Sequence, residues 1–439
     1  METKPASKAN GNDVSRRDFL VGSAATVAAT TALMATGNYA FAAGDDKIKV
    51  GLIGSGGRGT DAAHNILDAD PGVEIVAMGD LFKDHMDGKR KVLSEIGGPR
   101  FKVTDDTAFV GFDAYRHVLA TNCNYVILAT PPGYRPLHLR AAVEAGKNVF
   151  FEKPVGVDGQ GCKSVIESGE IAKKKGLSLV TGTQRRHQQS YIDTIKKIQE
   201  GAIGDITGGQ VYWNQGSLWM YPRKPEWSDG EWQHRDWYYF TWLCGDHIVE
   251  QHVHNLDVAN WIMGGPPVKA VGLGGRQVRT QPEYGHIYDH FAVEFEYANG
   301  FKIQSMCRQQ DNTVSNVSEH FQGTKGVVDF GDKAVIRPTI GDRWRYDGPT
   351  PNPYVIEHVD NIAAIRAGKP LNEAKRIAES TCTAILGREA CYTGQQLTFD
   401  EVMNSSTKLM PDNVAFGPAM TVPPVAVPGK TRLDRAWNA

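Results

Sequence analysis

Short apolar runs alternate with amphipathic segments along the N-terminal third of the chain. The apolar runs have strand length and lie at residues 48–53, 73–78, 124–129 and 148–151. The segments between them that carry a helical pattern include residues 60–67 and 137–145. Strands that alternate with helices predict an α/β fold with a parallel, doubly wound sheet. Ligands of such sheets bind beyond the carboxyl ends of the strands.

The pattern changes in the C-terminal half. Residues 290–297 alternate between apolar and polar positions before a turn at Asn299-Gly300, which predicts strands. Helical patterns follow at residues 354–367 and 374–392. The proline-rich end of the chain has no clear period and predicts an extended arm. We therefore expect a dinucleotide-binding domain at residues 44–175, a second domain at 176–400 and the arm at 401–439.

The first strand runs directly into a glycine-rich turn of the form G-x-G-x-x-G. The turn consists of Gly54, Ser55, Gly56, Gly57, Arg58 and Gly59. Between a strand and a helix, this motif lets a pyrophosphate approach the backbone at the helix N-terminus. Asp80 ends the second strand, 21 residues after Gly59, close to the spacing of about 20 expected for a ribose-binding carboxylate. A carboxylate there repels a 2′-phosphate, so we expect NAD rather than NADP.

Composition excludes several classes of protein. The 439 residues carry 48 basic and 50 acidic side chains, a net charge of −2, and no basic block is typical of nucleic-acid binding. The six cysteines are widely spaced without a Cys-x-x-Cys pair, which argues against a disulfide scaffold and common zinc sites.

The first 42 residues have the features of a bacterial export signal. Arg16-Arg17 precedes a small-residue apolar stretch, and Ala40-Phe41-Ala42 supplies a cleavage pattern. The apolar stretch is too weakly hydrophobic for a stable membrane span. We expect twin-arginine export, with the periplasm as the predicted location.

The sequence resembles the Gfo/Idh/MocA oxidoreductase family. The resemblance lies in the glycine turn, in Ala129-Thr130-Pro131-Pro132 with His138 after it, and in residues 145–154, which end in Glu152-Lys153-Pro154. It implies an N-terminal Rossmann domain, followed by an α/β domain with a large, mostly antiparallel sheet that is often used for oligomer contacts. Homo-oligomers (dimer or tetramer), NAD or NADP, and sugar, cyclitol or glycoside substrates are also implied.

The resemblance assigns roles to individual residues. Beyond the glycine turn and Asp80, the expected cofactor-binding residues are Thr130, Pro132, His138, Glu152, Lys153 and Gln184. The expected catalytic residues are Lys153, Glu250 and His254, with Glu250 at the position of the family's usual aspartate. Lys153 would polarise the substrate oxygen, and His254 would act as the base.

Residues 245–257 contain three histidines. If this stretch is one helix, His247, Glu250, His254 and Asp257 share a face, because they are spaced 3, 4 and 3 apart. His247 and Asp257 are therefore expected substrate-binding residues. A buried polar network and a metal set of His247, Glu250 and His254 are alternatives for this stretch; we expect no metal.

Six of the nine tryptophans lie within residues 213–242, among tyrosines and polar side chains. Aromatic faces stack on the C–H faces of sugars, and the polar groups bind hydroxyls. Trp213 and His234 are the expected substrate-binding residues here, and the family resemblance of the segment after residues 179–181 adds Arg185. The alternatives are an aromatic cluster that supports a long loop, or a subunit interface.

The sequence thus favours an NAD-dependent oxidoreductase that transfers hydride at a secondary hydroxyl of a sugar or glycoside. Free NAD is scarce outside the cytoplasm, so an exported enzyme is expected to retain its cofactor. Two alternatives remain: an NAD-dependent glycosidase that oxidises C3 transiently and eliminates the aglycone, and a non-catalytic sugar-binding protein.

Overall fold

A computed structural model describes residues 47–331, 333–412, 414–417 and 419–437. The expected export signal, residues 1–42, lies outside the described residues. Within these ranges, no helix combines the length and apolar character that a bilayer span requires.

The first sheet has six strands in the order β3-β2-β1-β4-β5-β6, and all neighbouring strands run parallel. The strands are β1 (Ile48–Ile53), β2 (Val73–Asp80), β3 (Ala108–Val110), β4 (Tyr125–Leu128), β5 (Asn148–Phe151) and β6 (Leu179–Thr181). This order confirms the predicted doubly wound Rossmann sheet. Its last strand, β6, lies beyond the domain boundary expected at residue 175.

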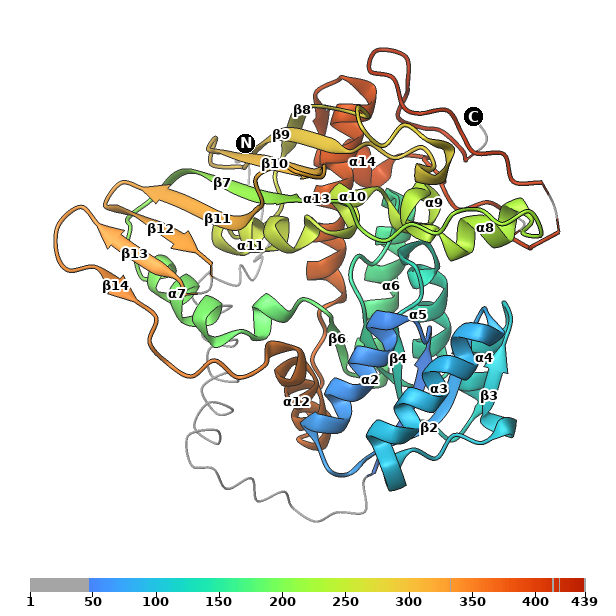
Figure 1. Cartoon of the computed structure of the whole chain (residues 1–439). Helices are drawn as coiled ribbons and strands as arrows, with labels where there is room; N and C mark the ends of the chain where they lie inside the picture. Colours follow the sequence, from blue (N-terminus) through green and yellow to red (C-terminus); the bar gives the residue numbers. More distant parts are fainter. Residues whose placement is uncertain (1–46, 332, 413, 418, 438–439) are drawn as a thin grey trace, which may run out of the picture. The chain divides into compact units, whose positions relative to one another are not determined.

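Helices connect these strands and cover the sheet (Figure 1). They are α2 (Gly57–Ala69), α3 (Lys83–Gly97), α4 (Ala114–Ala120), α5 (Arg135–Glu144) and α6 (Gly159–Lys175). Helix α6 has clear end signals: the Asp158 side chain accepts a hydrogen bond from the Gly161 amide, and Gly176 ends the helix at φ 68°. Both devices satisfy backbone groups that a helix end leaves unpaired.

The second sheet has nine strands in the order β14-β13-β12-β11-β7-β10-β9-β8-β15. Strands β7 and β10 run parallel, and the other described neighbours run antiparallel. The strands are β7 (Ile206–Gln215), β8 (Lys269–Gly275), β9 (His290–Glu296), β10 (Lys302–Gln309), β11 (Asn316–Gly323), β12 (Gly326–Phe330), β13 (Val335–Pro338), β14 (Trp344–Arg345) and β15 (Leu397–Thr398). The large, mostly antiparallel sheet is therefore confirmed.

The remaining helices follow the first sheet in the chain. They are α7 (Gln189–Gln199), α8 (Asp229–Arg235), α9 (Thr241–Cys244), α10 (His247–Glu250), α11 (Val253–Met263), α12 (Pro353–Arg366), α13 (Ala374–Thr393) and α14 (Phe399–Asn404). Helices α12 and α13 confirm the two helices expected near the C-terminus. The short 3₁₀ helix η4 (Gln184–His187) leads from β6 into α7.

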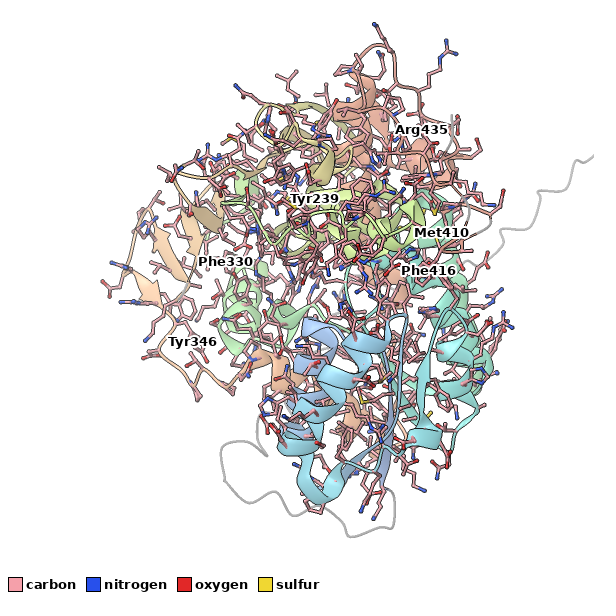
Figure 2. All side chains as sticks on the ribbon, turned by 45° about the vertical axis from the view of Figure 1, so that its right-hand side comes forward. Tyr239, Phe330, Tyr346, Met410, Phe416 and Arg435 are labelled. Atoms are coloured by element: carbon pink, nitrogen blue, oxygen red, sulfur yellow. The ribbon has the colours of Figure 1, made fainter. Side chains whose placement is uncertain are left out.

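The chain after α14 forms neither helix nor sheet strand in the described residues. It returns past α8 and α9 (Figure 1), and Met410, Phe416 and Arg435 mark its course in Figure 2. Arg435 donates to Glu389 of α13 at 2.6 Å. The expected arm therefore begins later than residue 401, because α14 continues to Asn404, and this ion pair ties the end of the extended part to α13.

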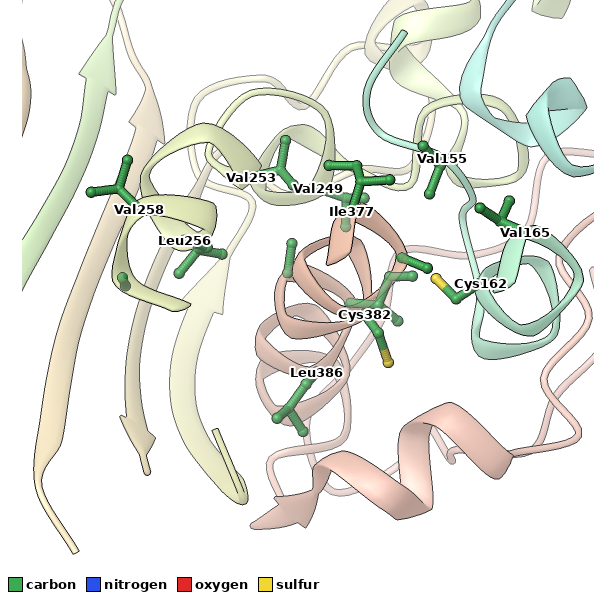
Figure 3. Close-up of a cluster of buried hydrophobic side chains, with 14 of the residues drawn as sticks. Val155, Cys162, Val165, Val249, Val253, Leu256, Val258, Ile377, Cys382 and Leu386 are labelled. Atoms are coloured by element: carbon green, nitrogen blue, oxygen red, sulfur yellow. The ribbon is translucent and has the colours of Figure 1, made fainter. Parts of the chain in front are cut away.

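Helix α13 is the centre of the hydrophobic core. Figure 3 shows Ile377, Cys382 and Leu386 of α13 among valines of α6 and α10, with Leu256 of α11 nearby. The helix packs on α6, α11 and β8. Helix α13 therefore joins the hydrophobic core of the Rossmann part to the core under the second sheet.

Candidate active site

The backbone of the glycine turn between β1 and α2 is not covered by other described atoms at Gly56 and Gly57. Gly54 has φ 90°, and a Cβ at Gly59 would lie 1.9 Å from the Gly54 carbonyl oxygen. A Cβ at Gly56 or Gly57 would meet no atom within 4 Å. No side chain caps the N-terminus of α2. The turn therefore packs tightly through Gly54 and Gly59 and is open on the side of Gly56, where backbone N–H groups can receive an anion.

Asp80 closes this turn against the end of β2. Its Oδ2 accepts hydrogen bonds from the Ser55 amide at 2.7 Å and the Ser55 hydroxyl at 3.0 Å. Its Oδ1 accepts from the Phe82 amide at 3.0 Å. A carboxylate oxygen can accept more than one hydrogen bond, so Asp80 retains capacity for ribose hydroxyls while it holds the turn.

The ends of β4 and β5 bring further predicted residues to the same edge of the sheet. Thr130 and Pro132 follow β4, and the Thr130 hydroxyl lies 3.0 Å from Nδ1 of His138 on α5. Glu152 follows β5 and accepts a hydrogen bond from Nε of Arg58 in the glycine turn at 2.6 Å. Arg58 also contacts Glu357 of α12 at 3.4 Å, a partner that the sequence analysis did not identify.

Lys153 reaches from the Rossmann part to α10. Its Nζ donates to the Glu250 backbone oxygen at 2.6 Å and to Glu250 Oε1 at 3.2 Å. The other carboxylate oxygen of Glu250 is buried and has no protein partner among the described residues. Lys153 and Glu250, both expected catalytic residues, are therefore in contact, with one Glu250 oxygen left for a ligand.

His254 lies beside this pair, in a strongly positive environment. Burial lowers the pKa of His254 well below its usual value, and the charges of Lys153, Arg185 and Arg58 lower it further. Its Nδ1 is buried without a described partner. The imidazole is consequently neutral near pH 7 and able to accept a proton.

His254 packs against Trp213, which in turn contacts the Arg185–Glu319 ion pair. The Trp213 ring stacks on the imidazole with centroids 5.7 Å apart, and the Arg185 guanidinium lies 5.9 Å from the Trp213 ring. Glu319 of β11 is fully buried and forms an ion pair with Arg185, while it accepts from Asn255 at 2.8 Å. Sequence reasoning missed Glu319; its only signal is a charged residue at an inward position of a strand, next to inward Phe321.

The histidine-rich stretch is not one helix. Helices α10 and α11 are separated at Gln251 and His252, so the expected single face of four residues does not form. His247 is fully buried and pairs with Asp246 at 2.9 Å. Asp257 is held by Arg186 at 2.8 Å and by the Ser380 hydroxyl at 2.8 Å. Protein partners thus engage both predicted substrate-binding residues.

His234 and His138, two other predicted site residues, lie in a group of aromatic side chains around Tyr134. The rings that contact them do not include His254. His234 of α8 lies 2.7 Å from the Tyr134 hydroxyl, and its Nδ1 lies 2.6 Å from the Gly230 oxygen. His138 lies between the rings of Tyr115 and Tyr134. Burial lowers the pKa of His234 to about 4 and of His138 to about 3, so both are neutral and act as packed aromatic groups.

These observations fit a dinucleotide with its nicotinamide near Lys153. The open surface at Gly56 accommodates a pyrophosphate, and Asp80 stands where a ribose is bound in Rossmann folds. The Gln184 side-chain oxygen is buried without a partner among the described residues, which leaves an acceptor near Arg185. Within the same ranges, no group of three or more His, Cys, Asp and Glu side chains is placed to hold a metal.

Comparison with known proteins identifies the family. Residues 48–183 match the family model described as "Oxidoreductase family, NAD-binding Rossmann fold", and residues 192–329 match the "GFO/IDH/MocA C-terminal domain". The chain belongs to the Gfo/Idh/MocA family. It is therefore an oxidoreductase-family protein with an NAD-binding Rossmann domain.

Proteins similar to this chain include, by their names, oxidoreductases of sugars and inositols. Inositol 2-dehydrogenase 3 of Saccharopolyspora erythraea is 25% identical over 358 residues, covering 79% of this chain and 94% of that protein. The structure of levoglucosan dehydrogenase with NADH and levoglucosan has a TM-score of 0.65 at 17% identity, covering 81% and 100% of the two chains. Aldose-aldose oxidoreductase from Caulobacter crescentus, complexed with glycerol, has a TM-score of 0.63 at 17% identity, covering 80% and 100%. At these identities, the two structures show the shared fold.

Proposed function

We propose that this chain is an NAD-dependent oxidoreductase that acts on a secondary hydroxyl of a sugar, cyclitol or glycoside. The observation that carries the proposal is the buried, neutral His254 beside the Lys153–Glu250 pair. A neutral base and a fixed ammonium at the end of a Rossmann sheet are the groups that alcohol oxidation requires. The names of the dehydrogenase relatives support the substrate class.

In the proposed mechanism, three side chains act on the substrate hydroxyls. His254 accepts the hydroxyl proton at its imidazole, whose Nδ1 is buried without a described partner; burial and the neighbouring cations keep the ring unprotonated before substrate binds. Lys153 turns an ammonium N–H toward the substrate oxygen, while its bond to the Glu250 backbone oxygen fixes its position. Glu250 offers its unpartnered oxygen to a neighbouring substrate hydroxyl. Bound NAD supplies the hydride acceptor.

Trp213 and Arg185 make a sugar or cyclitol ring the substrate that fits best. Trp213 is half-buried next to His254, and an aromatic side chain in this position can stack on the C–H side of a ring. Its indole N–H donates to Gln215 at 2.7 Å, which fixes the ring plane. Glu319 in turn fixes Arg185, whose remaining N–H groups can donate to substrate hydroxyls.

We also propose that the enzyme is exported and completes its redox cycle with a retained cofactor. The Arg16-Arg17 pattern supports export, and free NAD is scarce outside the cytoplasm. A retained cofactor must be reduced and reoxidised within one active site, either by two sugars in turn or within a single glycoside.

A homo-oligomer, dimer or tetramer, is part of the proposal. Val271, Leu273 and Met306 are exposed on strands of the second sheet, and Leu273 is 80% exposed. Leu273 and Met306 both pair in register with Ala292, so they lie on one face. An apolar sheet face of this kind favours contact with a second copy.

The test is to purify the mature chain and to supply NAD with a panel of inositols, free sugars and anhydrosugars. Reduced nicotinamide, detected by its absorbance, is the expected result for at least one compound. A parallel incubation with aryl glycosides separates the alternatives: aglycone release without net reduction would favour the glycosidase. Sugar binding without either reaction would contradict catalysis.

A further inference from the structure

The C-terminal arm is anchored at several points along the molecule. The Leu409 amide donates to Asp158 Oδ2 at 3.0 Å. The Met420 oxygen accepts from Gln233 of α8 at 2.6 Å, and the Trp437 ring lies 5.8 Å from Trp242. The stretch between Leu409 and Met420 is therefore held at both ends while it passes α8 (Figure 1).

Phe416, in the middle of that stretch, packs on the Rossmann part. Its ring stacks on Phe82 with centroids 5.5 Å apart and an interplanar angle of 12°. It also lies 5.0 Å from the ring of Phe112 and meets His234 edge-on at 5.7 Å. Figure 2 labels Phe416 above the blue helices of the Rossmann part. A residue far along the chain thus reaches the first domain.

Phe82 and Phe112 come from the two loops that surround Asp80. The Phe82 amide donates to Asp80 Oδ1 at 3.0 Å. The Gly111 amide, immediately before Phe112, donates to the Asp80 backbone oxygen at 2.9 Å. Because Rossmann folds bind the adenosine half of a dinucleotide beside this acid, the aromatic group stands at the adenosine end of the groove.

Helix α8 fixes the arm against this end. Arg235 lies over the Phe82 ring at 4.0 Å and forms an ion pair with Asp84 at 2.9 Å. A Cβ at Gly230 would lie 2.4 Å from the Ala415 oxygen, so the arm approaches the helix backbone directly. The position of Phe416 therefore follows from close packing as well as from its own ring contacts.

We propose that Phe416 is a cofactor-positioning residue that completes the adenosine subsite and slows the release of NAD. Phe416 and Phe112 are both half-buried, so the described residues do not fully cover either side chain, and a planar base can pack against them. Stacking on an aromatic ring stabilises a bound base without reading its edges. The inference rests on the proposed function, since it takes NAD as the cofactor, and it explains how one chain retains that cofactor.

The test compares Phe416→Ala, Phe416→Tyr and Val427→Ala in the mature chain after removal of bound nucleotide. Val427 is an exposed arm residue with no described contact to the Phe82 group, and it is the matched control. Calorimetry measures the affinities of ADP-ribose and of nicotinamide mononucleotide, which lacks the adenosine. Stopped-flow measurement gives the dissociation rate of NAD.

We expect Phe416→Ala to weaken ADP-ribose binding roughly tenfold or more, within the range that removal of a base-stacking aromatic produces. Its NAD dissociation should accelerate similarly, while its mononucleotide affinity stays unchanged. Phe416→Tyr should restore ADP-ribose affinity, and Val427→Ala should match the wild type. A folded Phe416→Ala protein with wild-type ADP-ribose affinity would overturn the role of the arm alone. A wild-type chain that binds no ADP-ribose would overturn the proposed function as well.

Discussion

The proposed chemistry depends on single side chains whose environment sets their protonation. His254 is neutral because it is buried among Lys153, Arg185 and Arg58, and a neutral imidazole is what a general base requires. Trp213 stacks on His254, and Glu319 contributes indirectly because it fixes Arg185.

Replacement of His254 by alanine should therefore remove the base and leave the cofactor site intact. We expect kcat to fall by roughly 10²–10⁴-fold, with unchanged affinity for NAD. Gln251→Ala is the matched control, because Gln251 lies between α10 and α11 and its side chain forms no hydrogen bond or ion pair with the described residues. Steady-state kinetics measures kcat, and calorimetry measures the affinity for NAD. A wild-type kcat in His254→Ala would show that another group is the base.

Sequence reasoning succeeded at residues whose neighbours along the chain define them. Lys153 and Glu152 follow a recognisable strand, and the glycine turn follows another. It left a buried polar network as one alternative for residues 245–257 but did not identify the partners of Asp257, because Arg186 and Arg376 come from different elements. Glu319 was missed for the same reason: its partner Arg185 lies 134 positions away.

At the scale of elements, different glycines of the turn from β1 to α2 serve the packing of α2 and the binding of the cofactor. Gly59 allows α2 to touch the Gly54 carbonyl, whereas Gly56 faces open space. The two glycines share one motif but have different physical roles.

Alanine substitutions should separate these two roles. Gly59→Ala should lower the free energy of unfolding by about 1–3 kcal/mol or more, because its Cβ would overlap the Gly54 oxygen. Gly56→Ala should leave the free energy of unfolding unchanged. Its NAD affinity should fall at least roughly tenfold, because the added methyl group would occupy the pyrophosphate site. Urea unfolding and calorimetry measure the two effects.

Gly88→Ala is the control for that series, because a Cβ there meets nothing within 4 Å on helix α3. It should retain NAD affinity and gain a little stability from helix propensity. Equal NAD affinity in Gly56→Ala and in the wild type would contradict the placement of the pyrophosphate.

Element boundaries were predictable where turn residues interrupt two helical segments, as Gly368-Lys369-Pro370 does between α12 and α13. The stretch of residues 245–257 was harder, because its spacing also fits one continuous helix. The structure ends α10 at Glu250 and begins α11 at Val253. His252, at the break, lies 2.7 Å from the Ser305 hydroxyl of β10, a tertiary contact that no local pattern reveals.

At the scale of the whole molecule, a buried charge cluster joins the Rossmann part to the C-terminal helices. His187 of η4 lies 2.6 Å from Asp360 of α12 and 3.7 Å from Glu373, just before α13. Glu373 also accepts from the Thr181 amide of β6 at 2.8 Å. Burial lowers the pKa of His187, but the hydrogen bond to Asp360 and the nearby negative charge of Glu373 outweigh it and raise the pKa to about 10.

This cluster should make stability depend on alkaline pH. Because the folded-state pKa of His187 exceeds its unfolded value of about 6.5, its contribution is complete below pH 6.5. The contribution declines as pH rises toward 10 and is lost above it. Between pH 6.5 and 10, the wild type should lose a few kcal/mol of unfolding free energy that His187→Gln does not lose.

The control for this comparison is His64→Gln, at an exposed histidine on α2 that lies 3.5 Å from Asp68. Its unfolding free energy should follow the wild-type pH dependence. If His187→Gln also followed it, the imidazolium of His187 would not contribute to stability in this range.

The two sheet architectures were predictable, the first from alternation and the second from family resemblance. The arm was predictable only as an extended segment. Its path past α8 to Phe82 and Phe112 depends on tertiary contacts such as Gly230 against Ala415, which the sequence pattern does not encode.

The central claim is that hydride moves between a ring carbon of the substrate and a nicotinamide held by the Rossmann part. The most direct measurement uses sugars and inositols deuterated at their ring carbons, incubated with the NAD-loaded chain and followed by mass spectrometry of the nicotinamide. We predict that one deuterium appears on the nicotinamide with wild-type protein and that its transfer is strongly slowed in His254→Ala. Retention of every deuterium on the ring carbons, in a chain that binds NAD, would contradict the account.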